Sequence, residues 1–181
     1  MSLSREQTFD FKDFPVLQSS RLLFRSLSVD NAEDIYELRL NEDVIKYIDR
    51  KPPKDIEAAK TFIDYVNTGF IKQKFIFWGI RLSSNDRLIG TASLWHFTDD
   101  KTEAEVGYEL HPSHWGKGYA HEALKEITNF SREVLKLKKM EAFTHHENVA
   151  SRHVLVKNKF VLNQNRVDEG NQNNVIYELK M

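Results

Sequence analysis

Hydrophobic and polar residues alternate along the middle of the chain with the two-residue period of β-strands. Three such segments follow one another, at residues 74–82, 88–97 and 102–111. The linkers between them, residues 83–87 and 98–101, are short and rich in turn-forming residues. The pattern therefore predicts an antiparallel meander of three strands.

Apolar residues at helical spacing flank this meander on both sides. Before it they are Ala58, Ala59, Phe62, Ile63 and Val66, and after it Ala120, Ala123, Leu124, Ile127, Phe130 and Val134. Nearer the N-terminus, residues 30–33 resemble a capping box that opens a helix, and residues 42–49 predict a short helical piece. Pro52 and Pro53 end that piece, because proline disfavours helix before it and donates no hydrogen bond.

The remaining apolar runs complete the order of elements. We expect strands at residues 21–27, 140–144, 160–162 and 175–179, and a helix at residues 148–159. The order β-α-α-β-β-β-α-β-α-β-β predicts an α/β (α+β) layer fold. The length of 181 residues favours a single domain over residues 1–181, with residues 1–19 only loosely structured.

Composition narrows the class of protein. The 26 Lys and Arg residues nearly balance the 27 Asp and Glu residues, so no overall charge argues for nucleic acid or an anionic membrane as a partner. The chain has no cysteine, which excludes disulfides, cysteine zinc sites and a thiol nucleophile. We see neither a signal-peptide pattern nor an apolar run of about 18 residues that would span a membrane, so we expect a cytoplasmic protein.

The joint between the third meander strand and the following helix contains HWGKGYA, residues 114–120. Gly116 and Gly118 give the backbone access to positive φ and remove side chains that would keep a phosphate from the amides at a helix start. Lys117 adds a cation. The alternative is a tight turn without a ligand. The spacing fits neither a P-loop nor a dinucleotide-binding fingerprint.

Three blocks in order carry a resemblance to a known family. They are SRLLFRSL at residues 20–27, EVGYELHPSHWGKGYAHEAL at residues 105–124, and NVASRHVLVKNKF at residues 148–160. Together they resemble the GNAT superfamily of N-acetyltransferases, in the branch similar to ribosomal-protein N-terminal (alanine/serine) acetyltransferases. The resemblance implies a mixed, mostly antiparallel central sheet of six to seven strands with helices on both faces. It also implies acetyl-CoA as the acetyl donor.

The same resemblance implies which residues bind coenzyme A. The amides of residues 115–120 would hold the pyrophosphate, and the strand before them would pair with the pantetheine arm. The binding residues would be Tyr108, Leu110, Trp115, Gly116, Lys117, Gly118, Tyr119, Ala120 and Asn148. Trp115 stands where the family usually has Gln or Arg, and Ala120 where it has Gly; we expect Trp115 to brace the loop from beneath.

Acetylation of an amine needs a proton acceptor, a donor for the oxyanion and an acid for the thiolate. Because cysteine is absent, we expect direct attack, with a backbone amide of residues 107–110 as the oxyanion donor. Glu105 is the first choice for the proton acceptor and Glu109 the second, although Glu105 also fits an ordinary exposed strand position. Ser151 is the expected acid, and it equally fits a helix-capping role beside Asn148.

The histidines and the acceptor give weaker signals. We expect the neighbouring His145 and His146 to point apart and predict no metal site. His96 fits either a substrate contact or a packed position. The acceptor is a protein N-terminal amine, or a small amine such as a polyamine, an amino acid or an aminoglycoside. A non-catalytic acyl-CoA sensor is a further alternative, and the sequence leaves a homodimer open. The acceptor pocket should involve the first two helices, the connection near Pro52 and residues 163–174.

Overall fold

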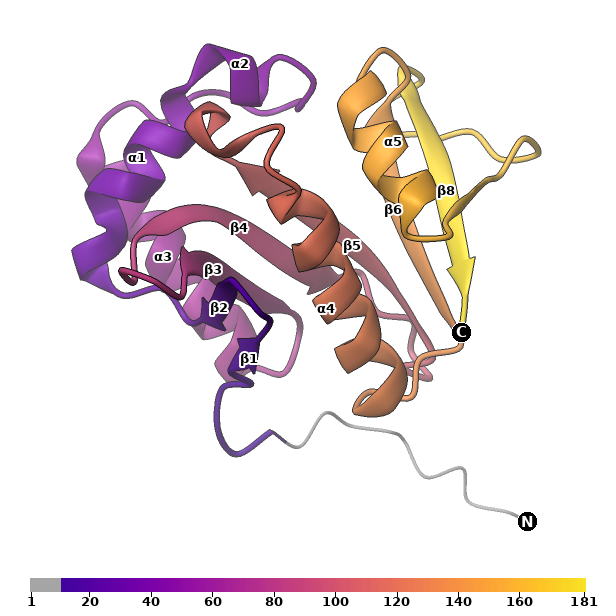
Figure 1. Cartoon of the computed structure of the whole chain (residues 1–181), viewed down its shortest axis with the longest axis horizontal. Coiled ribbons are helices and arrows are strands. Elements are labelled where there is room, and N and C mark those ends of the chain that lie inside the picture. Colours follow the sequence, from indigo (N-terminus) through magenta and orange to yellow (C-terminus); the bar gives the residue numbers. More distant parts are fainter. Residues whose placement is uncertain (1–10) are drawn as a thin grey trace.

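Eight strands form one sheet in the computed structural model, which describes residues 11–181. Their order across the sheet is β1-β2-β3-β4-β5-β6-β8-β7 (Figure 1). The strands are β1 (Leu17–Gln18), β2 (Leu22–Arg25), β3 (Ile76–Leu82), β4 (Leu88–Trp95), β5 (Glu103–Leu110), β6 (Lys139–His145), β7 (Val161–Leu162) and β8 (Asn174–Lys180). All neighbours pair antiparallel except β5 and β6. The predicted meander is therefore confirmed as β3, β4 and β5.

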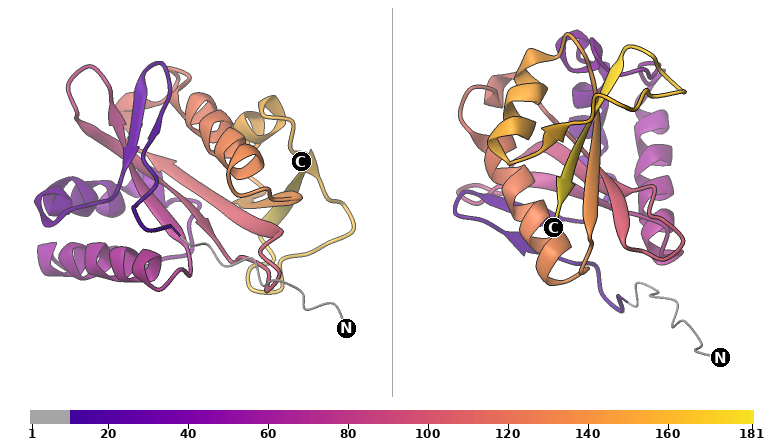
Figure 2. Two further views of the ribbon diagram at one scale, coloured as in Figure 1. Left: turned by 90° about the horizontal axis from the view of Figure 1, so that it is seen from below. Right: turned by 90° about the vertical axis from the view of Figure 1, so that its right-hand side faces the viewer.

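Helices cover both faces of this sheet, as the family resemblance implies (Figure 2). They are α1 (Ala32–Leu40), α2 (Glu42–Ile45), α3 (Ile56–Ile71), α4 (Tyr119–Glu133) and α5 (Val149–Lys157). No helix among residues 11–181 is both long and apolar enough to cross a membrane.

Alternation along β3 explains how each face gains its own core. Trp78 is fully buried toward α4, where its ring meets Phe130 edge-on at 5.7 Å between centroids. Its neighbour Phe77 faces the other way and meets Phe62 of α3 at 5.2 Å. The sheet is thus buried on both faces, and its strands read as nearly continuous apolar runs.

The parallel contact between β5 and β6 is short, and this positions the site. Pairing runs from Glu103 with Lys139 to Glu105 with Glu141, and it ends there. Beyond these residues the two strands diverge, and α4 begins at the open end of the split (Figure 1). We call this divergence of β5 and β6 the strand split.

Two sequence predictions need correction. The sheet has eight strands instead of six or seven, because residues 17–18, within the segment expected to be loose, pair with Leu23 and Phe24. The rest of the predicted loose segment, residues 1–10, lies outside the described residues. The capping box also lies earlier than predicted: Ser28 caps a short 3₁₀ turn, Val29–Asn31, and its N–H donates to Asn31 Oδ1 at 3.0 Å, whereas α1 itself begins at Ala32, within the predicted residues 30–33.

Candidate active site

The loop between β5 and α4 carries the glycines of the predicted anion site. Gly116 and Gly118 have φ values of 72° and 80°, a conformation that residues with side chains rarely adopt. A Cβ at Gly116 would meet nothing within 4 Å, and one at Gly118 would meet only Arg21 Nη2, at 3.5 Å. The backbone is therefore open where an anion would approach.

The amides of this loop are free from Gly116 onward. Within residues 11–181, the N–H groups of residues 116–118 donate to no protein acceptor. The first helical hydrogen bond runs from Glu122 N–H to Gly118 O at 3.1 Å, so the amides of Tyr119 and Ala120 precede the helical ladder. They lie at the positive end of the α4 dipole, an arrangement that binds phosphates.

Trp115 supports the loop from beneath, as expected. Its indole Nε1 donates to Leu110 O at 2.7 Å. Its own backbone N–H donates to Pro112 O at 3.0 Å, so that amide is already used within the protein and drops out of the predicted cradle. The Lys117 ammonium donates to Ser113 O at 2.8 Å, which holds this cation beside the loop.

The strand split presents backbone groups of β5 to a ligand. His111 N–H donates to Ile89 O of the β4 side, and the groups of successive residues alternate along a strand. The N–H and C=O groups of Tyr108 and the N–H of Leu110 therefore face away from β4, toward the split, whereas Leu110 O already accepts from Trp115 Nε1. An extended amide-containing chain placed there could pair with β5 as a further strand.

Ser151 and Tyr108 meet at this split, a contact that the sequence analysis did not foresee. The two side-chain oxygens lie 3.2 Å apart, and Tyr108 Oη also donates to Ser151 O at 3.3 Å. Burial raises the pKa of Tyr108 to about 12, against a lesser lowering by the bond to Ser151. Asn148 caps α5 by accepting from Ser151 N–H at 3.0 Å, so the predicted capping role of Asn148 is present and uses the backbone N–H of Ser151, not its hydroxyl.

Glu105 lies on the opposite face of the sheet, where it contacts His96. The Glu105 Oε2 and His96 Nδ1 atoms are 2.7 Å apart, and the Glu105 side chain is 20% exposed. Gly107, the next residue on this face, lies against Ser93, whose Oγ would be 2.9 Å from a Cβ at that position. Glu105 therefore stands beside a stretch of bare strand at the closed end of the strand split.

Glu109 shares the face of Glu105 but is more heavily engaged. It pairs with Arg50 at 2.8 Å and accepts from Thr91 Oγ1 at 3.2 Å. Arg39 lies near this pair, with its guanidinium 3.8 Å from the centre of the Phe62 ring. Burial and, to a lesser extent, the charge of Arg50 lower the pKa of Arg39 to about 10, against the opposing charge of Glu109. This group joins α1 and the connection before α3 to the sheet.

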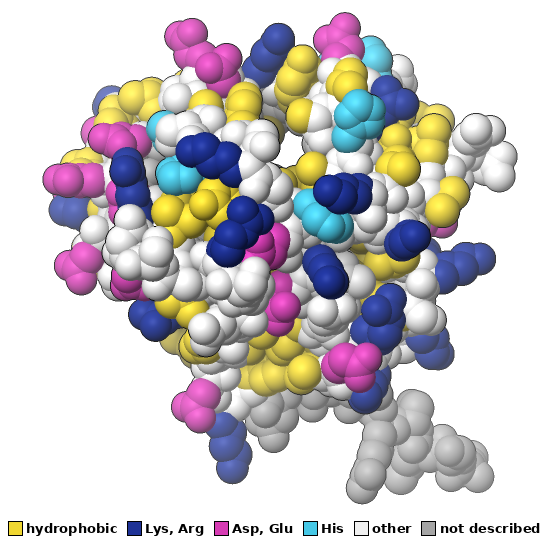
Figure 3. All heavy atoms as spheres, in the orientation of Figure 1, with side chains coloured by type: hydrophobic (Ala, Val, Ile, Leu, Met, Phe, Trp, Pro, Cys, Tyr) yellow, Lys and Arg dark blue, Asp and Glu magenta, His cyan; other side chains and the backbone are white. Residues whose placement is uncertain are grey.

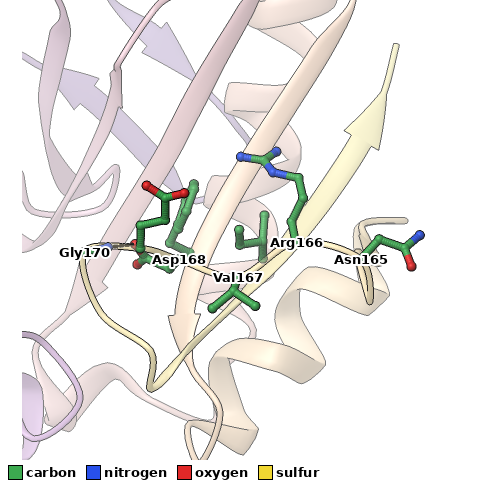
Figure 4. Close-up of a pocket in the computed structure, with 8 residues that line it drawn as sticks. Asn165, Arg166, Val167, Asp168 and Gly170 are labelled. Carbon is green, nitrogen blue, oxygen red and sulfur yellow. Dashed lines mark hydrogen bonds between the residues drawn. The ribbon is translucent and has the colours of Figure 1, made fainter.

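The segment between β7 and β8 contacts the same face of the sheet at β6 and β8. Arg166 pairs with Glu141 of β6 and, at 3.2 Å, with Glu178 of β8. A cavity of about 520 Å³ lies beside it, lined by Phe143, Asn165, Arg166, Val167, Asp168, Glu169, Gly170 and Ile176. Figure 4 shows Val167 between Arg166 and Asp168 along this segment. The cavity lies within the region where the acceptor pocket was expected.

Charge and histidine placement add two observations. Figure 3 shows Lys and Arg side chains gathered over the face that carries α4 and α5, the face from which the glycine loop is reached. The expectation that His145 and His146 point apart is wrong, since their rings stack with centroids 4.6 Å apart. Among residues 11–181, no three His, Cys, Asp or Glu side chains are grouped to hold a metal ion.

Comparison with known proteins identifies relatives of this chain. Residues 21–161 match the family model described as an acetyltransferase (GNAT) domain. The uncharacterized N-acetyltransferase YoaA of Bacillus subtilis (strain 168) is 30% identical over 147 residues, covering 81% of this chain and 83% of YoaA.

Two solved structures share the fold. One is the ribosomal-protein-S5-alanine acetyltransferase from Vibrio fischeri, with a TM-score of 0.76, 16% identity, and coverage of 92% of this chain and 96% of that one. The other is RimL, a ribosomal L7/L12 α-N-protein acetyltransferase in complex with coenzyme A, with a TM-score of 0.77, 18% identity, and coverage of 92% and 98%.

Proposed function

The chain belongs to the GNAT acetyltransferase family, and on that premise we propose that it transfers the acetyl group of acetyl-CoA to a primary amine. The observation that carries the proposal is the junction of two features: the free amides of residues 116–120 and the strand split whose open end lies beside them (Figure 1). The first suits a pyrophosphate and the second suits the amide-bearing pantetheine arm. Gly116 and Gly118 place no side chain beside these amides, which fits such a group.

Direct attack by the amine is the route that we propose. With no cysteine in the chain, no thiol can carry the acetyl group between donor and acceptor. Bound acetyl-CoA supplies an activated thioester. The protein residues then hold the amine close to it, accept a proton and donate one. The Tyr108 N–H, which faces the split, is the oxyanion donor in this proposal.

Glu105 suits the proton acceptor better than Glu109. Both oxygens of Glu109 are engaged, by Arg50 and Thr91, whereas Glu105 uses only Oε2, toward His96. The free Oε1 of Glu105 can take a proton from the amine directly or through a water. His96 holds the carboxylate in place from the exposed side.

Ser151 suits the acid that protonates the departing thiolate. Its hydroxyl contacts the phenol of Tyr108, which is protonated at neutral pH because its ordinary pKa is already about 10 and burial raises it further. If Tyr108 Oη donates to Ser151 O, the Ser151 hydroxyl proton stays available to the thiolate. The capping of α5 then falls to Asn148, and the Ser151 side chain serves the reaction.

A protein N-terminal amine is the acceptor that we propose first. Its reference pKa of about 7.7–8.0 lies well below the value of about 10.4 for lysine, so one carboxylate suffices to deprotonate it. The structural likeness to ribosomal-protein N-terminal acetyltransferases supports the same choice. A small amine is the second candidate, because the cavity of about 520 Å³ is large enough for one.

Thiol release from acetyl-CoA tests the proposal, measured with a panel of peptides and small amines. We expect turnover with at least one amine and a fall in kcat of about 10²–10⁴-fold for both Glu105→Gln and Ser151→Ala, the range for loss of a general acid or base. Coenzyme A affinity should stay within about twofold, since neither side chain faces the loop. Tight coenzyme binding without turnover on any amine would instead favour an acyl-CoA sensor.

A further inference from the structure

Arg21, in the turn between β1 and β2, contacts the start of α4 across the sheet edge. Its Nε and Nη2 atoms lie 2.7 and 2.6 Å from Glu122 Oε2. Its third nitrogen, Nη1, donates to Lys117 O at 3.0 Å. One guanidinium therefore joins the first turn of α4 to the glycine loop, a geometry to which the planar donor fork of arginine is suited.

Glu122 is held from several directions at once. Its Oε1 accepts from Ser19 Oγ at 2.8 Å, from Ser20 Oγ at 3.0 Å and from Arg21 N–H at 2.8 Å. Burial raises the pKa of this carboxyl, but the hydrogen bonds outweigh burial and the pKa is lowered overall. Glu122 is therefore a fixed anion at neutral pH, and the turn at residues 19–21 is tied to α4 through it.

The bond to Lys117 O fixes the direction of a loop amide. A trans peptide is planar, with its C=O and the following N–H pointing in opposite directions. Because Arg21 holds Lys117 O on its own side, the Gly118 N–H points to the other side. The Tyr119 ring, 4.5 Å from the guanidinium carbon, packs against Arg21 and limits its movement.

The pair also resolves a conflict of charge. A carboxylate in the first turn of a helix is favoured by the dipole, but it would repel a diphosphate bound at the same helix start. Arg21 neutralises Glu122, and the Arg21 side chain remains 47% exposed beside the loop. Arg21 thus supplies, from outside the loop's own sequence, the positive charge that offsets Glu122.

We propose that Arg21 and Glu122 are a positioning pair for coenzyme binding, which hold the loop with the Gly118 amide turned toward the diphosphate. The inference rests on the proposed function, since it assumes that this loop binds coenzyme A. It assigns a role to the turn between β1 and β2, which lies 101 residues from Glu122 in the sequence.

Two acetyl donors, one with the diphosphate and one without it, test this inference. Coenzyme A affinity is measured by calorimetry, and kcat/KM is measured with acetyl-CoA and with acetyl-pantetheine, which lacks the diphosphate. We expect Arg21→Ala to weaken coenzyme A binding and lower kcat/KM for acetyl-CoA by about tenfold, the effect of losing one charge-assisted hydrogen bond. With acetyl-pantetheine the change should stay within about twofold.

Arg25→Ala is the matched control. The Arg25 side chain is 48% exposed, nearly the same as that of Arg21, and its Nη1 lies 3.4 Å from Asp86 Oδ1. Because this pair does not involve the glycine loop, the variant should behave as wild type. Glu122→Gln should weaken coenzyme A binding by a few-fold although it removes a negative charge and keeps Arg21. Arg21→Lys should restore part of the loss, since lysine keeps the charge but not the fork.

Several results would overturn the inference. Tighter coenzyme A binding by Glu122→Gln would show that Arg21 acts through charge alone. An equal loss of kcat/KM with acetyl-CoA and with acetyl-pantetheine in Arg21→Ala would show general destabilisation. If wild type binds coenzyme A and Arg21→Ala matches Arg25→Ala, the pair fails while the proposed function stands. If wild type itself does not bind coenzyme A, both fail.

Discussion

The two faces of this sheet present different kinds of polar groups: main-chain groups on one and charged side chains on the other. The side of α4 and α5 presents main-chain groups, the amides of residues 116–120 and the exposed edge of β5, shaped by glycines with positive φ. The side of α1 and α3 presents charged side chains held in ion pairs, including Arg50 with Glu109 and Arg166 with Glu141. In the proposed function, the first arrangement serves a ligand of fixed chemistry, and the second can vary with the acceptor.

This difference explains which part of the site leaves a signal in the sequence. A backbone cradle needs particular residues at particular positions, because only glycine adopts positive φ without strain. An ion pair between distant segments needs only complementary charges, and many positions can supply them. In the proposed function, the coenzyme half of the site is therefore defined by a short motif, whereas the acceptor half is defined by tertiary structure.

The largest effect should come from Gly118→Val. A β-branched residue is strained at a φ of 80°, and its side chain would meet Arg21 and turn the loop amides away. We expect coenzyme A affinity to fall by about 10²-fold, equivalent to the loss of two hydrogen bonds to a charged group. Calorimetric titration with coenzyme A measures it.

Gly170→Val is the control on the other face. Gly170 lines the cavity near Asp168 and has no positive φ, so this variant should alter only the KM for the acceptor. If both variants weaken coenzyme A equally, the division of labour between the two faces is wrong.

A smaller effect is expected from Glu109→Gln. The change leaves Arg50 without its anion at a site where the two side chains are 18% and 10% exposed. We expect a loss of about 2 kcal/mol in the free energy of unfolding, discounted for partial exposure, and a rise of the acceptor KM. Coenzyme A affinity should not change, because Glu109 faces away from the loop.

Urea unfolding and coenzyme titration measure these quantities for Glu109→Gln. Glu57→Gln breaks the exposed pair with Lys60 and serves as control, with an expected cost of about 0.4 kcal/mol. A large loss of coenzyme binding in Glu109→Gln would assign Glu109 to the other half of the site.

The smallest effect at neutral pH is expected for Tyr108, whose contribution to stability changes only at alkaline pH. Burial raises its pKa to about 12 in the folded protein, above the usual value of about 10. The contribution of the protonated phenol to stability is complete below pH 10 and is lost as the pH rises toward 12, by up to roughly 3 kcal/mol. Tyr108→Phe should remove this part of the alkaline loss, measured by urea unfolding at pH 9 and pH 11.5. An unchanged alkaline slope would contradict it.

Much of the fold could be predicted because local patterns determine it. The meander, the long helix after the glycine loop and the break at Pro52 all follow from periodicity and backbone chemistry. The strand β1 was missed because two residues show no alternation, and its partner β2 gives it register. The helix cap was misplaced by a few residues because Ser28 and Asp30 are both good capping types.

The site was predictable only where it is local. Gly116, Gly118 and Asn148 stand in short motifs, and the structure gives each the expected conformation or capping bond. The contact of Tyr108 with Ser151 joins residues 43 apart, and that of Arg21 with Glu122 joins residues 101 apart. No periodicity links such positions, so tertiary structure alone brings them together.

A titration of ¹⁵N-labelled protein with coenzyme A, followed by amide chemical shifts, tests the central claim most directly. If main-chain donors hold the diphosphate, the amides of Gly116, Gly118 and Tyr119 should show the largest downfield shifts, because each gains a hydrogen bond to an anion. The account would be contradicted if coenzyme A bound while these amides kept their shifts and amides elsewhere moved instead.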